Sequence, residues 1–201
     1  MSSSSATSSS SGSTTASSGT GGAGTGGSIG TGGGGMGGMM GTGGGGGAAA
    51  FALTSAGFTE GSAIPVKFAC AGPNVSPPLA WPAGPGGTQS YAVVLTDKSN
   101  NLIHWVIWDI PGSVHALPEN VQKTATPSAP AGAKQVKSYD NTTVGYLGPC
   151  PPNQHTYEFA VYALDVATLP NVTTASTRTD VFTEIKNHDL ASAKLTGTYT
   201  P

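Results

Sequence analysis

The first 50 residues limit the fold most strongly, because they lack the side chains that a folded core needs. Residues 1–50 contain 20 Gly and 12 Ser and have no charged residue, aromatic residue, His or Cys. Such a segment buries too little apolar surface to offset the entropy that is lost on ordering it. We therefore predict a disordered, Gly/Ser-rich tether over residues 1–50 and one folded domain over residues 51–201.

Charge and hydropathy restrict the partners of residues 51–201. The 8 basic and 10 acidic residues all fall in this part of the chain, and the formal net charge is −2. Because no basic patch is available to neutralise phosphates, we expect no nucleic-acid partner. No apolar run approaches the roughly 18 residues of a membrane-spanning helix, so we also expect no transmembrane segment.

Short apolar runs predict a mainly β domain. The β-branched run at 90–96 is typical of a central strand, and residues 104–110 alternate with period 2. Several short strands with long polar connections favour an antiparallel β-sandwich with small helical additions. We predict further strands over 51–55, 64–70, 157–164 and 195–199, a helix over 179–192, and mostly loop over 115–145.

The alternation in the predicted strand at 104–110 assigns its side chains to two faces. One face carries His104, Val106, Trp108 and Ile110, and the other carries Trp105, Ile107 and Asp109. A lone histidine at the start of a strand is more often a structural hydrogen-bonding residue than a site residue. For His115 and His188 we expect surface or capping roles.

Four polar side chains lie next to predicted strands and rigid turns. Asp97 follows one strand directly, His104 begins the next, and His155 and Tyr157 share a face of a third because they are two residues apart. Imidazole and phenol groups donate hydrogen bonds to anions, and a carboxylate orients a histidine. The proline-rich residues 148–152 have little conformational entropy left to lose, so they are suited to form fixed walls of a pocket.

Several long motifs follow one another in a fixed order along residues 51–201. In this order they resemble the bacterial phosphatidylethanolamine-binding proteins, also called Raf-kinase-inhibitor-like proteins. The resemblance covers essentially the whole of 51–201 and none of 1–50. The motifs occupy residues 51–53, 64–72, 74–81, 87–97, 104–111, 117–119, 146–152, 155–165 and 188–199.

The resemblance implies a fold, a pocket and a ligand class. The fold is a large antiparallel sheet packed on a smaller one, with short helices near the C-terminus. The pocket binds phosphate-like or carboxylate anions, including phospholipid headgroups. Carried over position by position, it uses Asp97, His104, Pro152, His155 and Tyr157, with Trp105 and Leu147 nearby.

One family signature is incomplete, which implies that one rim of the pocket is shortened. The family's first signature usually reads Asp-Pro-Asp-x-Pro, whereas this chain has Asp97, Lys98 and Ser99, without the second acid or either proline.

The same resemblance places Cys70 and Cys150 in segments that approach the pocket. A disulfide between them would brace it in an oxidising compartment, and the alternative is two buried thiols. The low charge density and this disulfide favour an extracytoplasmic or secreted protein. No secretory signal is visible after Met1, which favours the alternative of a cytoplasmic protein.

These observations favour a small-anion or headgroup-binding module with a regulatory or inhibitory role. The alternatives are an inhibitor or partner-binding protein that acts on a protease or kinase, and a hydrolase or metal-dependent enzyme. We expect no enzyme and no cofactor, because no strand–turn–helix nucleophile elbow of the G-x-S-x-G type occurs and metal-site motifs with close His or Cys spacing are absent. Asp97, His104 and His155 nevertheless remain a conceivable set of three metal ligands.

Overall fold

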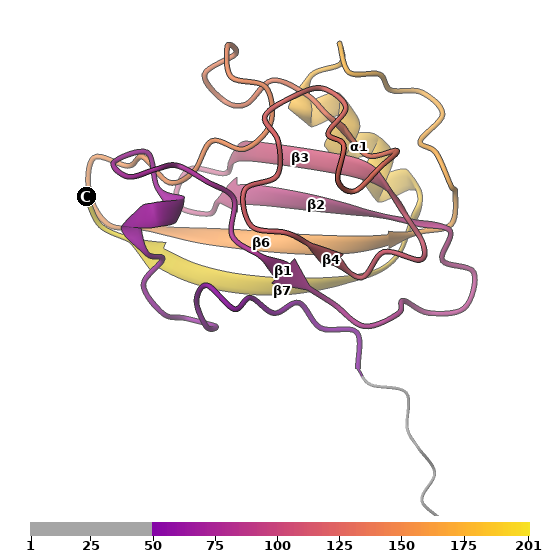
Figure 1. Cartoon of the computed structure of the whole chain (residues 1–201), viewed down its shortest axis with the longest axis horizontal. Helices are drawn as coiled ribbons and strands as arrows, with labels where there is room; N and C mark the ends of the chain where they lie inside the picture. Colours follow the sequence, from indigo (N-terminus) through magenta and orange to yellow (C-terminus); the bar gives the residue numbers. More distant parts are fainter. Residues whose placement is uncertain (1–49) are drawn as a thin grey trace, which may run out of the picture. The chain divides into compact units, whose positions relative to one another are not determined.

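The predicted strands form two antiparallel sheets (Figure 1). The computed structural model describes residues 50–201, so the tether predicted over residues 1–50 lies outside the described residues except for its last position. The larger sheet has the strand order β5-β3-β2-β6-β7, and the smaller sheet pairs β1 with β4. The elements are η1 (Val66–Phe68, a 3-10 helix), β1 (Leu79–Ala80), β2 (Ser90–Asp97), β3 (Leu102–Pro111), β4 (Ala116–Leu117), β5 (Lys134–Gln135), β6 (His155–Leu164), α1 (Arg178–Asn187) and β7 (Asp189–Tyr199). The prediction of a mainly β domain with two sheets is confirmed.

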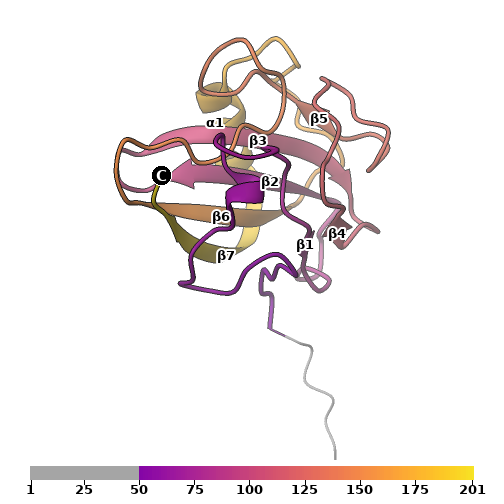
Figure 2. The ribbon, with the colours of Figure 1, turned by 60° about the vertical axis from the view of Figure 1, so that its left-hand side comes forward.

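The larger sheet has an apolar core on each of its faces. Tyr91, Val93 and Leu95 of β2 belong to the core that also contains residues of β1 and β4. Ala92 and Val94 belong to the core on the side of α1. Figures 1 and 2 show α1 and the β1–β4 pair on opposite sides of the larger sheet. Burial on both faces explains why β2 is almost continuously apolar.

A β-bulge in β3 corrects the predicted assignment of its faces. Val93 pairs with Ile107, whereas Tyr91 pairs with Ile110, so β3 contains one extra residue in this interval. Asp109 lies there with a left-handed φ of 55°. Ile110 therefore shares the core of Ile107, and the prediction that they face opposite sides is wrong.

Two segments that were predicted as strands do not form them. Residues 51–55 contribute a single bridge between Thr54 and β1. Within 64–70, Pro65 has φ −58°, and the chain turns into η1, where the Phe68 N–H donates to the Pro65 carbonyl at 2.9 Å. A proline cannot donate to a sheet and suits the start of a helical turn, so local turn chemistry overrides the apolar pattern.

The C-terminal helix is shorter than predicted, and the last strand is longer. The helix predicted over 179–192 ends at Asn187, and His188 forms its C-cap, which is the capping role predicted for this histidine. The predicted strand over 195–199 is the end of β7, which already begins at Asp189. This early start lets β7 pair along the whole length of β6. In residues 50–201, α1 is the one α-helix where short helices were predicted.

Candidate functional site

Three of the predicted site residues meet at one end of β2 and β6. Asp97, the last residue of β2, pairs in register with Tyr157 of β6, so their side chains point to the same face of the sheet. His155, the first residue of β6, lies two positions before Tyr157 and shares this face. The sheet thereby brings together residues that are about 60 positions apart in the chain.

The carboxylate of Asp97 is buried and binds His155. Asp97 Oδ2 lies 2.6 Å from His155 Nδ1, and Asp97 Oδ1 accepts from the Ser99 N–H at 2.9 Å. The Asp97 side chain is 3% exposed, and that of His155 is 15% exposed. Because a carboxylate only accepts, His155 Nδ1 carries the proton of this bond. The ring is thus oriented by Asp97, and its Nε2 has no hydrogen-bond partner in the described part of the chain.

The hydroxyl of Tyr157 is buried and makes no hydrogen bond within residues 50–201. The Asp97 carboxylate and the Cys150 backbone N–H lie near it without hydrogen-bond geometry. Burial, followed by the negative charge of Asp97, raises the pKa of the Tyr157 phenol, which therefore keeps its proton and remains a donor. A buried donor without an acceptor costs about 1–3 kcal/mol, so this hydroxyl favours binding of an acceptor atom.

A second β-bulge directs His104 toward the same face. The register of β2 and β3 shifts by one residue here, which makes His104 the extra residue between Ile103 and Trp105. His104 and Trp105 both contact residues 146–148, His104 through hydrogen bonds and Trp105 through ring packing. They therefore share a face, and the prediction that they lie on opposite faces is wrong.

His104 is buried and presents one ring nitrogen to the cluster. Its Nδ1 lies 3.2 Å from the carbonyl oxygens of both Leu147 and Gly148, so Nδ1 carries a proton and donates to them. The ring meets the Tyr157 ring edge-on, with 5.4 Å between centroids. Burial lowers the pKa of His104 below its usual 6.5, so the ring is neutral at pH 7. Its Nε2 is then a hydrogen-bond acceptor.

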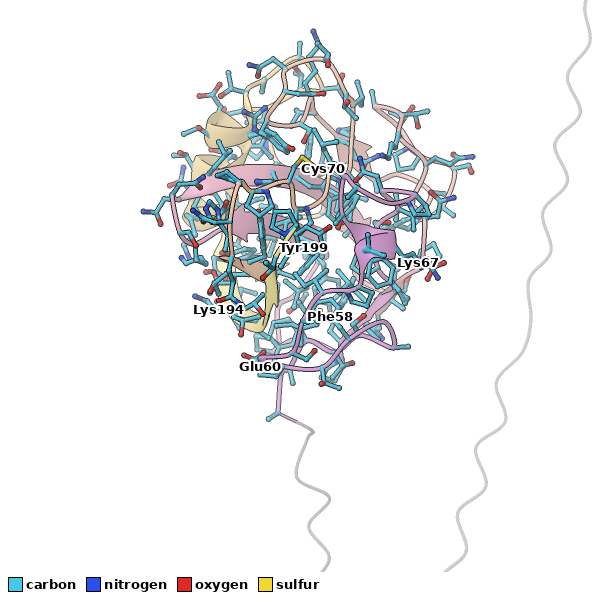
Figure 3. The ribbon with its side chains drawn as sticks, turned by 90° about the vertical axis from the view of Figure 1, so that its left-hand side faces the viewer. Phe58, Glu60, Lys67, Cys70, Lys194 and Tyr199 are labelled. Carbon is cyan, nitrogen blue, oxygen red and sulfur yellow. A yellow bond between two sulfur atoms is a disulfide. The ribbon has the colours of Figure 1, made fainter. Side chains whose placement is uncertain are left out.

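A disulfide ties down the segment that holds His104. The structure joins Cys70 and Cys150, which are 80 positions apart, with 5.3 Å between their Cα atoms. Figure 3 shows Cys70 at the same end of the domain as Tyr199, which is the cross-strand partner of His155. The bridge therefore lies at the end of the sheet where the polar side chains converge.

Gly148 allows this segment to approach the 3-10 helix closely. A Cβ at Gly148 would lie 1.9 Å from the Phe68 carbonyl oxygen, so no other residue fits without a backbone shift. The Gly148 N–H donates to Asn74 Oδ1 at 2.9 Å. Pro152, which was also predicted to line the pocket, is exposed, and its contribution to the site remains a prediction.

Sequence reasoning missed one residue of the cluster, Tyr139. It lies in the region 115–145 that was predicted as mostly loop, where no periodicity indicates which side chains point inward. Its ring packs on the His104 ring with 4.1 Å between centroids.

Four hollows on residues 50–201 lie outside the cluster. Hollows of about 320 to 660 Å³ occur elsewhere on residues 50–201, and Asp97, His104, His155 and Tyr157 line none of these. One hollow of about 390 Å³ borders His155 through Gln154 and Tyr199.

Residues 50–201 contain neither a metal-binding arrangement of side chains nor a membrane-spanning helix. No group of three or more His, Cys, Asp and Glu residues there is arranged to hold a metal ion. No helix in this part of the chain has the length and apolarity needed to cross a membrane.

Comparison with known proteins identifies the family of the chain. A family model described as phosphatidylethanolamine-binding protein matches residues 54–200. A UPF0098 protein of Methanothermobacter thermautotrophicus is 38% identical over 146 residues, which cover 71% of this chain and 93% of that protein. The predicted lipoprotein LppC of Mycobacterium tuberculosis is 37% identical over 127 residues, 60% of this chain and 58% of that protein. The crystal structure of YbcL from E. coli, described as a member of the mammalian PEBP family, aligns with a TM-score of 0.69 and 30% identity over 75% of this chain and 98% of that chain. The chain described here belongs to the phosphatidylethanolamine-binding protein family.

Proposed function

We propose that the domain binds a small oxyanion, such as phosphate or a small phosphorylated headgroup, at the cluster of His104, His155 and Tyr157. The observation that carries this proposal is the buried Tyr157 hydroxyl, which has no acceptor within residues 50–201. It lies beside a histidine whose ring is oriented by Asp97. An anion supplies the missing acceptor.

The hydrogen-bonding groups of the cluster match a protonated oxyanion. Tyr157 donates, and His155 would donate from Nε2 if that nitrogen also carries a proton, while its Nδ1–H remains bound to Asp97. A neutral His104 accepts at Nε2. Hydrogen phosphate offers oxygen acceptors together with one O–H donor, so it satisfies all three groups.

We propose binding rather than catalysis as the function of this cluster. A hydrolase of the serine or cysteine type needs a nucleophile within hydrogen-bond reach of a histidine base. Within residues 50–201, no Ser, Thr or Cys side chain bonds to the ring of His104 or His155, and both cysteines are in the disulfide.

Thermal unfolding with inorganic phosphate tests the binding proposal. A ligand at 100 times its Kd adds about 2.7 kcal/mol of stability, and we expect a rise in Tm of about 5–11 °C for a domain of this size. His155→Ala should abolish the rise. His115→Ala is the matched control, because His115 is exposed, and it should keep the rise. An unchanged wild-type Tm at 100 mM phosphate contradicts the proposal.

We further propose that the protein works outside the cytoplasm. Disulfides persist in oxidising compartments, and one relative is a predicted lipoprotein. Acid quenching of whole cells, followed by denaturation in the presence of a maleimide of large mass, reads the thiol state directly. We expect no mass shift, and a protein labelled at both Cys70 and Cys150 would contradict this localisation.

A further inference from the structure

Tyr139 packs against the cluster, but the proposed binding of an anion by His104, His155 and Tyr157 gives it no role. Its half-buried ring covers one side of the His104 imidazole, with 4.1 Å between centroids and 43° between the planes. Tyr157 meets the same imidazole at 5.4 Å and 82°. His104 thus packs against two phenol rings, and the nearer ring, that of Tyr139, covers part of the imidazole.

Hydrogen bonds within the loop that carries Tyr139 stabilise its conformation. Lys137 and Val144 form an antiparallel bridge, and the Ser138 N–H donates to the Thr143 carbonyl at 2.7 Å. The Asp140 carboxylate, next to Tyr139, accepts from the backbone N–H groups and hydroxyls of the two threonines that follow Asn141, at distances of 2.6–2.9 Å. This closed turn leaves the backbone of Tyr139 little freedom to move.

The same loop is also held from both sides by the rest of the domain. Arg178, the first residue of α1, donates to the carbonyls of Lys137 and Ser138 and, at 3.3 Å, to Asn141 Oδ1. The Ser138 hydroxyl donates to the backbone carbonyl of His104. Tyr139 therefore moves with β3 and α1, and its ring is a fixed wall rather than a mobile flap.

We infer that Tyr139 determines ligand size at this cluster: its ring admits an oxyanion as small as phosphate and excludes phosphate esters with a bulky substituent. The inference rests on the proposed anion binding. It follows from the direct packing of Tyr139 on His104, which leaves no space above that face of the imidazole. Removal of the ring opens a space of about the size of a phenol group against the face of the His104 imidazole that Tyr139 covers.

Calorimetric titration with inorganic phosphate and with phenyl phosphate tests the inference. The wild type should bind phosphate at least about tenfold more tightly than phenyl phosphate, a difference of about 1.4 kcal/mol. Tyr139→Ala should reduce this ratio to about one or reverse it. Tyr139→Phe is the matched control, because it keeps the ring and loses only the hydroxyl, and it should keep the wild-type ratio. An unchanged ratio in Tyr139→Ala overturns the inference.

A second measurement needs no variant and covers the case in which Tyr139→Ala does not fold. The affinity of the wild type should fall stepwise from inorganic phosphate to methyl phosphate to phenyl phosphate, whereas equal affinities overturn the inference. The outcome also separates the two proposals. A wild type that binds no phosphate refutes the proposed function and the inference with it. A wild type that binds phosphate and phenyl phosphate equally refutes the role of Tyr139 alone.

Discussion

The disulfide between Cys70 and Cys150 should contribute a large part of the stability of the domain. It closes a loop of 80 residues, and the chain-entropy relation for a loop of this length gives about 4.5 kcal/mol at 25 °C. At about 2–4 °C per kcal/mol, this corresponds to a fall in Tm of about 9–18 °C when the bridge is broken. The prediction concerns the unfolded chain, whose freedom the bridge restricts.

Calorimetric unfolding of the double variant Cys70→Ser and Cys150→Ser measures this contribution. The wild type in a phosphine reductant is the matched control, because it loses the same bridge without any substitution. Both samples should lose about the same stability. A loss of less than about 1.5 kcal/mol in both would refute the reasoning, since it would mean that other contacts already hold the unfolded chain compact or that the bridge is strained.

Three further predictions follow from single residues. Gly148→Ala should cost at least about 2 kcal/mol in urea unfolding, because the new Cβ would lie 1.9 Å from the Phe68 carbonyl oxygen; a cost below 0.5 kcal/mol, on the order of an ordinary surface change, would contradict this close approach. Thr177→Ala removes the capping box with Asp180 at the start of α1 and should cost about 1 kcal/mol, and no loss of stability would show that the cap is not needed. The pKa of His104 in the folded state lies below its unfolded value of 6.5. Its contribution to the free energy of unfolding is therefore complete above pH 6.5 and is lost as the pH falls from 6.5 through the lower folded pKa. Unfolding of the wild type and of His104→Gln from pH 8 to pH 5 should show a shallower loss at acid pH in the variant, and identical slopes would contradict the assignment.

The long strands could be predicted from the sequence because their signal is local. The β2 run is apolar and β-branched, and β6 alternates, so each strand shows its own burial pattern without reference to a partner. Asp97, His155 and Tyr157 stand at the ends of such strands, but their meeting in one pocket was implied by the family resemblance, because it depends on the pairing of β2 with β6.

The rest depends on contacts between distant residues. The bulge at His104 results from the register in which β3 pairs with β2. No residue in β3 gives a sequence signal that predicts it. Tyr139 lies in a loop whose path is set by Arg178, about 40 positions away, and by the turn around Asp140. The short β1 and β4 strands likewise exist only because Leu79 and Leu117 pair with each other. A local pattern carries no information on such partners.

The central claim, that an oxyanion binds among His104, His155 and Tyr157, is tested most directly by nuclear magnetic resonance of the histidine rings. The chain has 4 histidines, and two of them, His115 and His188, lie outside the cluster and serve as internal controls. Titration with inorganic phosphate at constant pH and ionic strength should shift the ring nitrogen signals of His104 and His155 along one saturating curve and leave those of His115 and His188 unchanged. Equal small shifts of all four, or no saturation at His155, would contradict the account.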